Sequence, residues 1–243
     1  MNLSLNRERG IDPFIMTPLK IVRAGHILEV SLVSLSEMRT LLRIDASSQT
    51  APSHSRSLAD HYEARWRDHH PEGKVLTRDL VRDPLPHLDE ATIAVFYAGC
   101  DPSDGEIPPG IALSDQLISE LKEADNILIS SAVYNFGMPS ALKAWIDHIV
   151  RFGHTIARGE KGSVGLLAGK QACFLTARGG TPERSPDYQY PMLQAVFAYI
   201  GIPKTNWISL EGTRIPDGGL ESRIAKARTA IDDLFTRNEH IVR

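Results

Sequence analysis

The chain has 243 residues, of which 42% are hydrophobic and 23% charged, so it has the length and composition of a globular protein with a substantial core. Its 27 basic and 30 acidic residues give a net charge of -3, which argues against a protein that binds nucleic acid or another polyanion. No apolar run approaches the roughly 18 to 20 residues that a membrane span requires, so we expect no membrane partner.

Residues 1–37 do not read as a signal peptide, because the apolar patch at 27–35 contains Glu29 and no small-residue cleavage site follows it. Met38 stands immediately before the first convincing strand. We therefore expect 1–37 to be a leader that contributes nothing to a site, either poorly ordered or the result of a gene start placed upstream of Met38. The alternative is an ordered extension over the surface. Residues 38–243 are predicted to form one domain.

From Met38 onward, short apolar runs alternate with segments of helical periodicity, which is typical of a βαβ protein. Strands are predicted at 40–46, 74–80, 126–133, 170–176 and 206–210. Helices are predicted at 58–69, 89–97, 111–123, from Pro139 to about 149, at 192–200 and at 220–234. The polar, glycine-rich segment 153–169 is predicted to form a flap over a pocket.

Strands joined by crossover helices form a parallel sheet with helices on both faces, and right-handed crossovers leave few possible windings. The best fit is α/β, a flavodoxin-like doubly wound five-stranded sheet of order 2-1-3-4-5. The switch point of this order lies between the first and third strands, so the loops after Ala46 and Val133 would face each other across one crevice. We expect a ligand there.

The first of these loops carries Ser47, Ser53 and Ser55 between a strand end and a helix start. Unpaired N–H groups at a helix N-terminus, together with hydroxyl donors, can hold a phosphate without a lysine. The alternative is that Ser53 or Ser55 only caps the helix. Both interpretations remain open from the residues alone.

The other two loops suit a flat ring. Tyr134, Asn135 and Phe136 offer two aromatic faces around an amide, which fits a heteroaromatic ring with a polar edge. Gly179 and Gly180 would let backbone N–H groups approach a ligand, although a tight turn is the simpler explanation of that pair. Taken together, the loops describe a flavin mononucleotide (FMN) site better than a site for any other cofactor.

Other motifs are incomplete. No GxGxxG follows the first strand, the segment 165–170 is one residue short of a P-loop, and 162–165 is not a GxSxG elbow. Cys100 and Cys173 lie far apart without histidines at ligand spacing, so we predict free thiols in a reducing compartment and no metal site. His54, His148 and His154 are candidate proton donors, with a solvated or helix-end histidine as the alternative for each.

The three loops also resemble a known family. Residues 47–55, the run 133–136 followed by 139–147, and residues 177–180 are similar to the flavin-binding segments of the FMN-dependent NADH:azoreductase (NADH:quinone oxidoreductase) family. The resemblance extends from about Arg39 to the C-terminus. It implies three groups of ligands: Ser47, Ser53, His54 and Ser55 for the ribityl phosphate, Val133, Tyr134, Asn135 and Phe136 for the isoalloxazine, and Ala177, Arg178, Gly179 and Gly180 for its pyrimidine side.

The sequence departs from the family's usual pattern at four places. The family often has Pro-Arg where this chain has Ser48-Gln49, Met at Val133, Ser or Thr at Ala177, and an aromatic residue near Ile156. The differences at Ser48-Gln49 and at Ala177 would weaken flavin binding slightly. The last bears on substrate preference.

The resemblance implies an FMN-dependent oxidoreductase that uses NADH to reduce quinones or aromatic azo compounds by ping-pong two-electron transfer. It also implies a cytoplasmic homodimer with two sites at the interface. The flavin carries the chemistry, so no residue is named as a catalytic acid or base, while the N–H groups of Gly179 and Gly180 are predicted to stabilise negative charge on the ring.

Two other functions occur on the same topology. A flavodoxin-type electron carrier without NADH-dependent activity is the alternative, but its usual strongly acidic face is missing. A phosphoacceptor signalling module requires an aspartate at the end of the third strand, where this chain has Ala132 and Val133.

Overall fold

The computed structural model describes residues 20–23, 26–29, 38–98, 107–184 and 186–238. The chain divides into two compact units, Met1–Glu37 and Met38–Arg243. In the first unit, β1 (Lys20–Arg23) and β2 (His26–Glu29) pair antiparallel in a small hairpin. The sequence prediction placed no strand in this leader.

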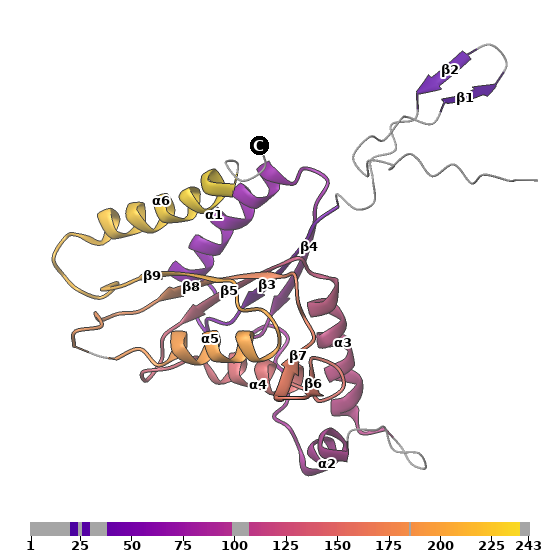
Figure 1. Cartoon of the computed structure of the whole chain (residues 1–243). Helices are drawn as coiled ribbons and strands as arrows, with labels where there is room; N and C mark the ends of the chain where they lie inside the picture. Colours follow the sequence, from indigo (N-terminus) through magenta and orange to yellow (C-terminus); the bar gives the residue numbers. More distant parts are fainter. Residues whose placement is uncertain (1–19, 24–25, 30–37, 99–106, 185, 239–243) are drawn as a thin grey trace, which may run out of the picture. The chain divides into compact units, whose positions relative to one another are not determined.

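The second unit is built on a five-stranded sheet in the order β4-β3-β5-β8-β9 (Figure 1). Its strands, all parallel, are β3 (Thr40–Asp45), β4 (Lys74–Asp79), β5 (Asn126–Ala132), β8 (Gln171–Ala177) and β9 (Thr205–Leu210). Numbered along the sheet-forming strands alone, this is 2-1-3-4-5, so the predicted fold is confirmed. The carboxyl ends of β3, β5 and β8 consequently meet at one edge.

Helices cover both faces of the sheet (Figure 1). On one face lie α1 (His54–His69) and α6 (Leu220–Asn238). On the other lie α3 (Pro109–Glu123), α4 (Ser140–Ile149) and α5 (Gln189–Tyr199), with the short α2 (Glu90–Ala98) beside α3. Each predicted helix is present, with ends shifted by a few residues.

The central strands are apolar on both sides because both of their faces are covered. In β3, Leu42 and Ile44 pack into the cluster with α3, α4 and α5, while Leu41 packs with α1 and α6. In β5, Ile127 packs into the first of these clusters and Leu128 into the second. A continuous apolar run thus serves two cores through the alternation of side chains along a strand.

The predicted flap at 153–169 is a hairpin in a different place. Its strands are β6 (Ile156–Gly159) and β7 (Gly162–Gly165), and it packs against the carboxyl end of α5. A Cβ on Gly165 would lie 2.1 Å from the backbone nitrogen of Gly201, so only glycine permits this contact. Because α5 ends next to the start of β9, the hairpin lies toward the edge of the sheet opposite the loops of the predicted crevice. The flap prediction is therefore wrong for this chain.

Within the part of the chain that the structure describes, no helix combines the length and apolar character needed to cross a bilayer.

The aromatic centre of the core on the α5 side should dominate stability. Phe197 is fully buried, with its ring centroid 5.0 Å from that of Phe174 and 6.5 Å from that of Trp145. We expect Phe197→Ala to lower the free energy of unfolding by about 3–5 kcal/mol, the usual range for an emptied aromatic site. The measurement is urea unfolding at fixed protein concentration. Tyr199→Ala, on the same helix but 44% exposed, is the matched control and should change the value by less than about 1 kcal/mol.

Candidate cofactor site

A cleft opens at the carboxyl edge of the sheet and has a volume of about 350 Å³. It is lined by residues from all three predicted loops: Ser47, Ser53, His54, Ser55, Val133, Tyr134, Asn135, Ala177, Arg178 and Gly179. Four further lining residues were not among the predicted site residues, namely Gln49, Ala132, Thr213 and Arg214. The loops therefore converge as the strand order required.

Phe136 and Gly180 lie outside this lining. The Phe136 side chain is 52% exposed, and its carbonyl accepts a hydrogen bond from the N–H of Tyr188 at 2.9 Å. The carbonyl of Gly180 accepts from the N–H of Gly212 at 2.9 Å, so Gly180 joins the loop after β9. Their roles as ligands remain predictions.

The first turn of α1 forms one end of the cleft. Ser53 has extended backbone and is the N-cap, with its Oγ accepting from the N–H of Arg56 at 3.5 Å. The Oγ of Ser55, a buried residue, lies 3.4 Å from that of Ser53. Capping by Ser53 does not exclude anion binding, because the first N–H groups of a helix have no acceptor within the helix.

The loop after β5 is a tight, strained turn. Tyr134 and Gly137 exchange backbone hydrogen bonds of 2.8 and 3.0 Å, and the two residues between them, Asn135 and Phe136, have φ of 47° and 71°. Two consecutive positive φ values are the pattern of a type I′ turn. A positive φ is rare for a bulky side chain such as phenylalanine, and such strain is concentrated at functional sites.

The loop after β8 is bonded to the loop after β9. The carbonyl of Arg178 accepts from the N–H and the hydroxyl of Thr213, at 3.0 and 3.1 Å, and the carbonyl of Gly179 accepts from the N–H of Arg214 at 3.2 Å. These contacts bring Thr213 and Arg214 to the cleft. The predicted strand order could have indicated these two residues, because the fifth strand lies beside the fourth and ends at the same edge of the sheet.

Buried charges lie beside this loop. The guanidinium of Arg178, a buried residue, is 3.9 Å from the carboxylate of Asp187. Burial raises the pKa of Glu211, and the charge of Arg178 partly opposes that shift. The rim therefore combines a buried cation with nearby carboxyl groups.

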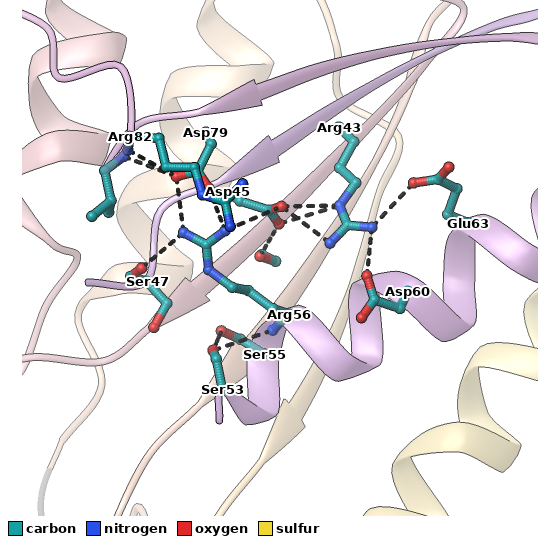
Figure 2. Close-up of polar contacts among 12 residues, drawn as sticks. Arg43, Asp45, Ser47, Ser53, Ser55, Arg56, Asp60, Glu63, Asp79 and Arg82 are labelled. Carbon is teal, nitrogen blue, oxygen red and sulfur yellow. Dashed lines mark hydrogen bonds and ion pairs between the residues drawn. The ribbon is translucent and has the colours of Figure 1, made fainter. Parts of the chain in front are cut away.

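A polar row crosses the sheet at the ends of its first strands (Figure 2). Asp45, the last residue of β3, is in register with Asp79 on β4 and with Ser130 on β5. The Ser130 hydroxyl donates to Asp45 at 2.5 Å. Two arginines offset the carboxylates: Arg43 lies 3.0 Å from Asp45, and Arg56 lies 2.6 Å from Asp79. No local feature of the sequence indicates this row, because its members are distant in sequence and match no motif.

The Arg56–Asp79 ion pair keeps its charges at neutral pH. Hydrogen bonds from Arg56 hold the pKa of Asp79 at about 2, well below its usual value. The hydrogen bond to Asp79 likewise raises the pKa of Arg56. Burial tends to lower the pKa of Arg43, but its charge and hydrogen-bond contacts with Asp45 outweigh that effect and raise it.

Of the three candidate histidines, only His54 lines the cleft, where it is exposed. His148 is buried in the last turn of α4, with Nε2 3.0 Å from the carbonyl oxygen of Pro86, and His154 lies in the turn before β6. Among the described residues there is no cluster of three or more His, Cys, Asp or Glu side chains that could hold a metal ion.

Relatives of known name match nearly the whole second unit. The sequence profile of the flavodoxin-like fold family matches residues 39–235. A protein of Hydrogenovibrio crunogenus named FMN-dependent NADH:quinone oxidoreductase is 38% identical over 200 residues, covering 81% of this chain and 99% of the relative. One of Xanthobacter autotrophicus with the same name is 45% identical over 170 residues, covering 68% of this chain and 82% of the relative.

Solved structures agree in fold. A Bacillus anthracis structure titled FMN-dependent NADH-azoreductase in complex with FMN superposes with a TM-score of 0.70 at 22% identity, covering 81% of this chain and 99% of the other. A second azoreductase from that species gives a TM-score of 0.74, also at 22% identity, with 82% and 100% covered. From its fold and its sequence relatives, the chain belongs to the flavodoxin-like fold family and, within it, to the FMN-dependent NADH:quinone oxidoreductases.

Proposed function

We propose that this chain binds FMN in the cleft at the carboxyl edge of its sheet and uses NADH to reduce quinones or aromatic azo compounds. One observation carries the proposal: three loops distant in sequence line a single cleft with a hydroxyl-rich helix N-terminus, an aromatic turn and a glycine. The names of the relatives agree with it.

The helix end of the cleft fits a phosphate. Ser47 and Ser55 are 3% and 1% exposed yet line the cleft, so their hydroxyls are held by the surrounding fold. The positive end of the α1 dipole and its free N–H groups favour an anion at this place. We assign Ser47, Ser53, His54 and Ser55 to the phosphate of FMN.

The opposite part of the cleft fits a flat ring. Tyr134 and Asn135 line it from the strained turn, in which Asn135 has a positive φ. Val133 is fixed by its N–H, which donates to the carbonyl of Ala177 at 3.0 Å. We assign the Val133 to Phe136 turn to the isoalloxazine, and the loop from Ala177 to Gly180 to its pyrimidine side.

When bound, FMN supplies the redox chemistry by accepting electrons from NADH and passing them to the acceptor. The protein binds and orients the ring, and backbone N–H groups of the Gly179 loop are placed to stabilise negative charge on its pyrimidine side. No side chain is assigned as a catalytic acid or base. A pure electron carrier is not favoured, since the relatives are named oxidoreductases and the net charge is only -3.

The proposal extends to a homodimer in the cytoplasm. Large apolar side chains are exposed on elements of the α3–α5 side of the sheet, among them Ile93 (37%), Tyr97 (88%) and Val164 (51%). Exposed apolar patches mark interaction surfaces, and a second copy is the occupant we propose. The buried free thiol of Cys173 fits a reducing compartment, while Cys100 lies outside the described residues.

We propose that residues 1–37 contribute nothing to the site. The family match begins at residue 39, and the lining of the cleft begins at Ser47. We propose that Met38 begins the functional unit.

The proposal is tested first by the visible spectrum of the purified full-length protein and by steady-state NADH oxidation with a soluble quinone or azo dye. We expect the visible absorption of a bound flavin, and turnover without a partner reductase. A flavin that NADH alone does not bleach under anaerobic conditions would favour the electron carrier. A colourless protein that takes up no added FMN would refute both assignments.

The approach of backbone to ring is tested at Gly179. A Cβ there would lie 3.2 Å from Cδ of Arg214, a cleft residue, so a bulky side chain must displace Arg214 or enter the cleft. We expect Gly179→Val to weaken FMN binding about tenfold, corresponding to about 1.4 kcal/mol, and Gly179→Ala to have a smaller effect. Flavin fluorescence titration measures both. Wild-type affinity in the valine variant would contradict the role assigned to this loop.

The homodimer is tested by light scattering, where we expect 2 × 26.9 kDa for the wild type. Tyr97→Glu places a charge in the exposed apolar surface and should shift the mass toward that of the monomer. Lys226→Glu is the control, because this exposed residue lies on α6, across the sheet from α2. A monomeric wild type would contradict the proposed homodimer. A dimer that is insensitive to Tyr97→Glu and sensitive to Lys226→Glu would place the interface on the α6 side of the sheet.

A further inference from the structure

The phosphate end of the cleft is formed by two short segments separated by an exposed loop. Ser47 follows β3 and is buried, and Ser55 in the first turn of α1 is buried as well. The residues between them, 48–52, are exposed. An exposed loop of this kind does little to fix the distance between the two groups of hydroxyls.

Arg56 joins these two segments directly (Figure 2). It belongs to the first turn of α1, and its Nη2–H donates to the carbonyl oxygen of Ser47 at 3.1 Å. The same guanidinium grips Asp79 with two hydrogen bonds, of 2.6 and 2.9 Å. A planar fork holding a carboxylate in this way is rigid, so the carbonyl of Ser47 is held at a fixed place relative to the helix start.

The partner of Arg56 is itself firmly placed. Asp79 ends β4, and its Oδ1 accepts the backbone N–H groups of Val81 and Arg82 at 3.0 and 3.2 Å. It is in register with Asp45, whose carboxylate also lies 3.5 Å from Arg56. The position of the guanidinium is thus fixed relative to the carboxyl ends of two strands, β3 and β4.

Charge gives the same group a second role. Asp45 and Asp79 place two carboxylates at the strand ends close to the helix start, where they would repel a phosphate. Arg56 offsets this repulsion from within the first turn. Arg43 also pairs with Asp45, but its other contacts are with Asp60 and Glu63, farther along α1.

We propose that Arg56 is a positioning residue for the phosphate of FMN: it does not line the cleft, but it holds Ser47 and the first turn of α1 at the spacing that the phosphate requires, and it neutralises the carboxylates beneath. This inference rests on the proposed function and adds to it a residue outside the cleft lining. It predicts that loss of the Arg56 clamp weakens recognition of the phosphate and leaves recognition of the ring unchanged.

The test compares FMN with riboflavin, which has the same ring without the phosphate, on the full chain freed of flavin. Arg56→Gln alone would leave Asp79 with only the more distant guanidinium of Arg82, 3.5 Å away, so the main variant is the charge-balanced double variant Arg56→Gln/Asp79→Asn. We expect its affinity for FMN to fall about 10- to 100-fold, the range for lost charge-assisted hydrogen bonds, while its riboflavin affinity stays within about twofold. A cooperative melting transition confirms folding.

Two single variants make the result specific. Arg56→Lys keeps the charge but lacks the planar fork, so its preference for FMN over riboflavin should lie between those of the wild type and the double variant. Arg43→Gln removes a buried arginine from the same cluster without touching Ser47. It should lower the melting temperature, and because Asp45 keeps its contact with Arg56, it should lower the ratio of the two affinities much less than the double variant does.

Three results would overturn the inference. One is a double variant whose ratio of FMN affinity to riboflavin affinity equals that of the wild type. Another is equal weakening of FMN and riboflavin, which would indicate a general structural role. The third is a fall in the ratio of FMN affinity to riboflavin affinity in Arg43→Gln that is as large as the fall in Arg56→Gln/Asp79→Asn. Should the double variant not melt cooperatively, an unchanged ratio in Arg56→Lys decides against the proposal. A wild type that binds neither flavin refutes the proposed function itself, so the two failures are distinguishable.

Discussion

The parallel register of the central strands is the constraint on which the rest of the molecule depends. Asp45, Ser130 and Asp79 end up side by side because β4, β3 and β5 run in one direction and in register. The same register brings the loops after β3, β5 and β8 to one edge, where they line the cleft. Burial of both faces of these strands by helices stabilises the arrangement, so the core and the site have a common origin.

The cleft combines features that would be costly elsewhere in the fold. Two consecutive residues with positive φ, Asn135 and Phe136, are held by the hydrogen bonds between Tyr134 and Gly137 and by the bond from Tyr188. The buried residues Arg43, Arg56 and Asp45 form ion pairs beside the helix start. Removing one member of such a buried ion pair is strongly destabilising, whereas the intact pair holds its neighbours in a defined geometry. Rigidity around the cleft therefore comes from polar contacts as well as from apolar packing.

The proposed division of labour follows from this geometry. Side chains and backbone of the strand-end loops provide shape and donors, and the family's cofactor provides the redox chemistry. Two positions at which the sequence differs from the family's usual pattern, Gln49 and Ala177, line the cleft. A third, Ile156, is buried in the hairpin against α5 and lies outside the lining.

The amino-acid sequence by itself determined the strand order and the three loops, because apolar runs, periodicity and turn residues are local signals. It also identified most of the cleft lining, including Ser55, Asn135 and Gly179. Only the tertiary structure decided what depends on contacts between distant residues: the place of the β6–β7 hairpin, the approach of Thr213 and Arg214, and the clamp of Arg56 on Ser47 and Asp79. An arginine next to a serine in the first turn of a helix carries no local sign of its partner, since the strand that supplies the carboxylate is brought beside it by the fold.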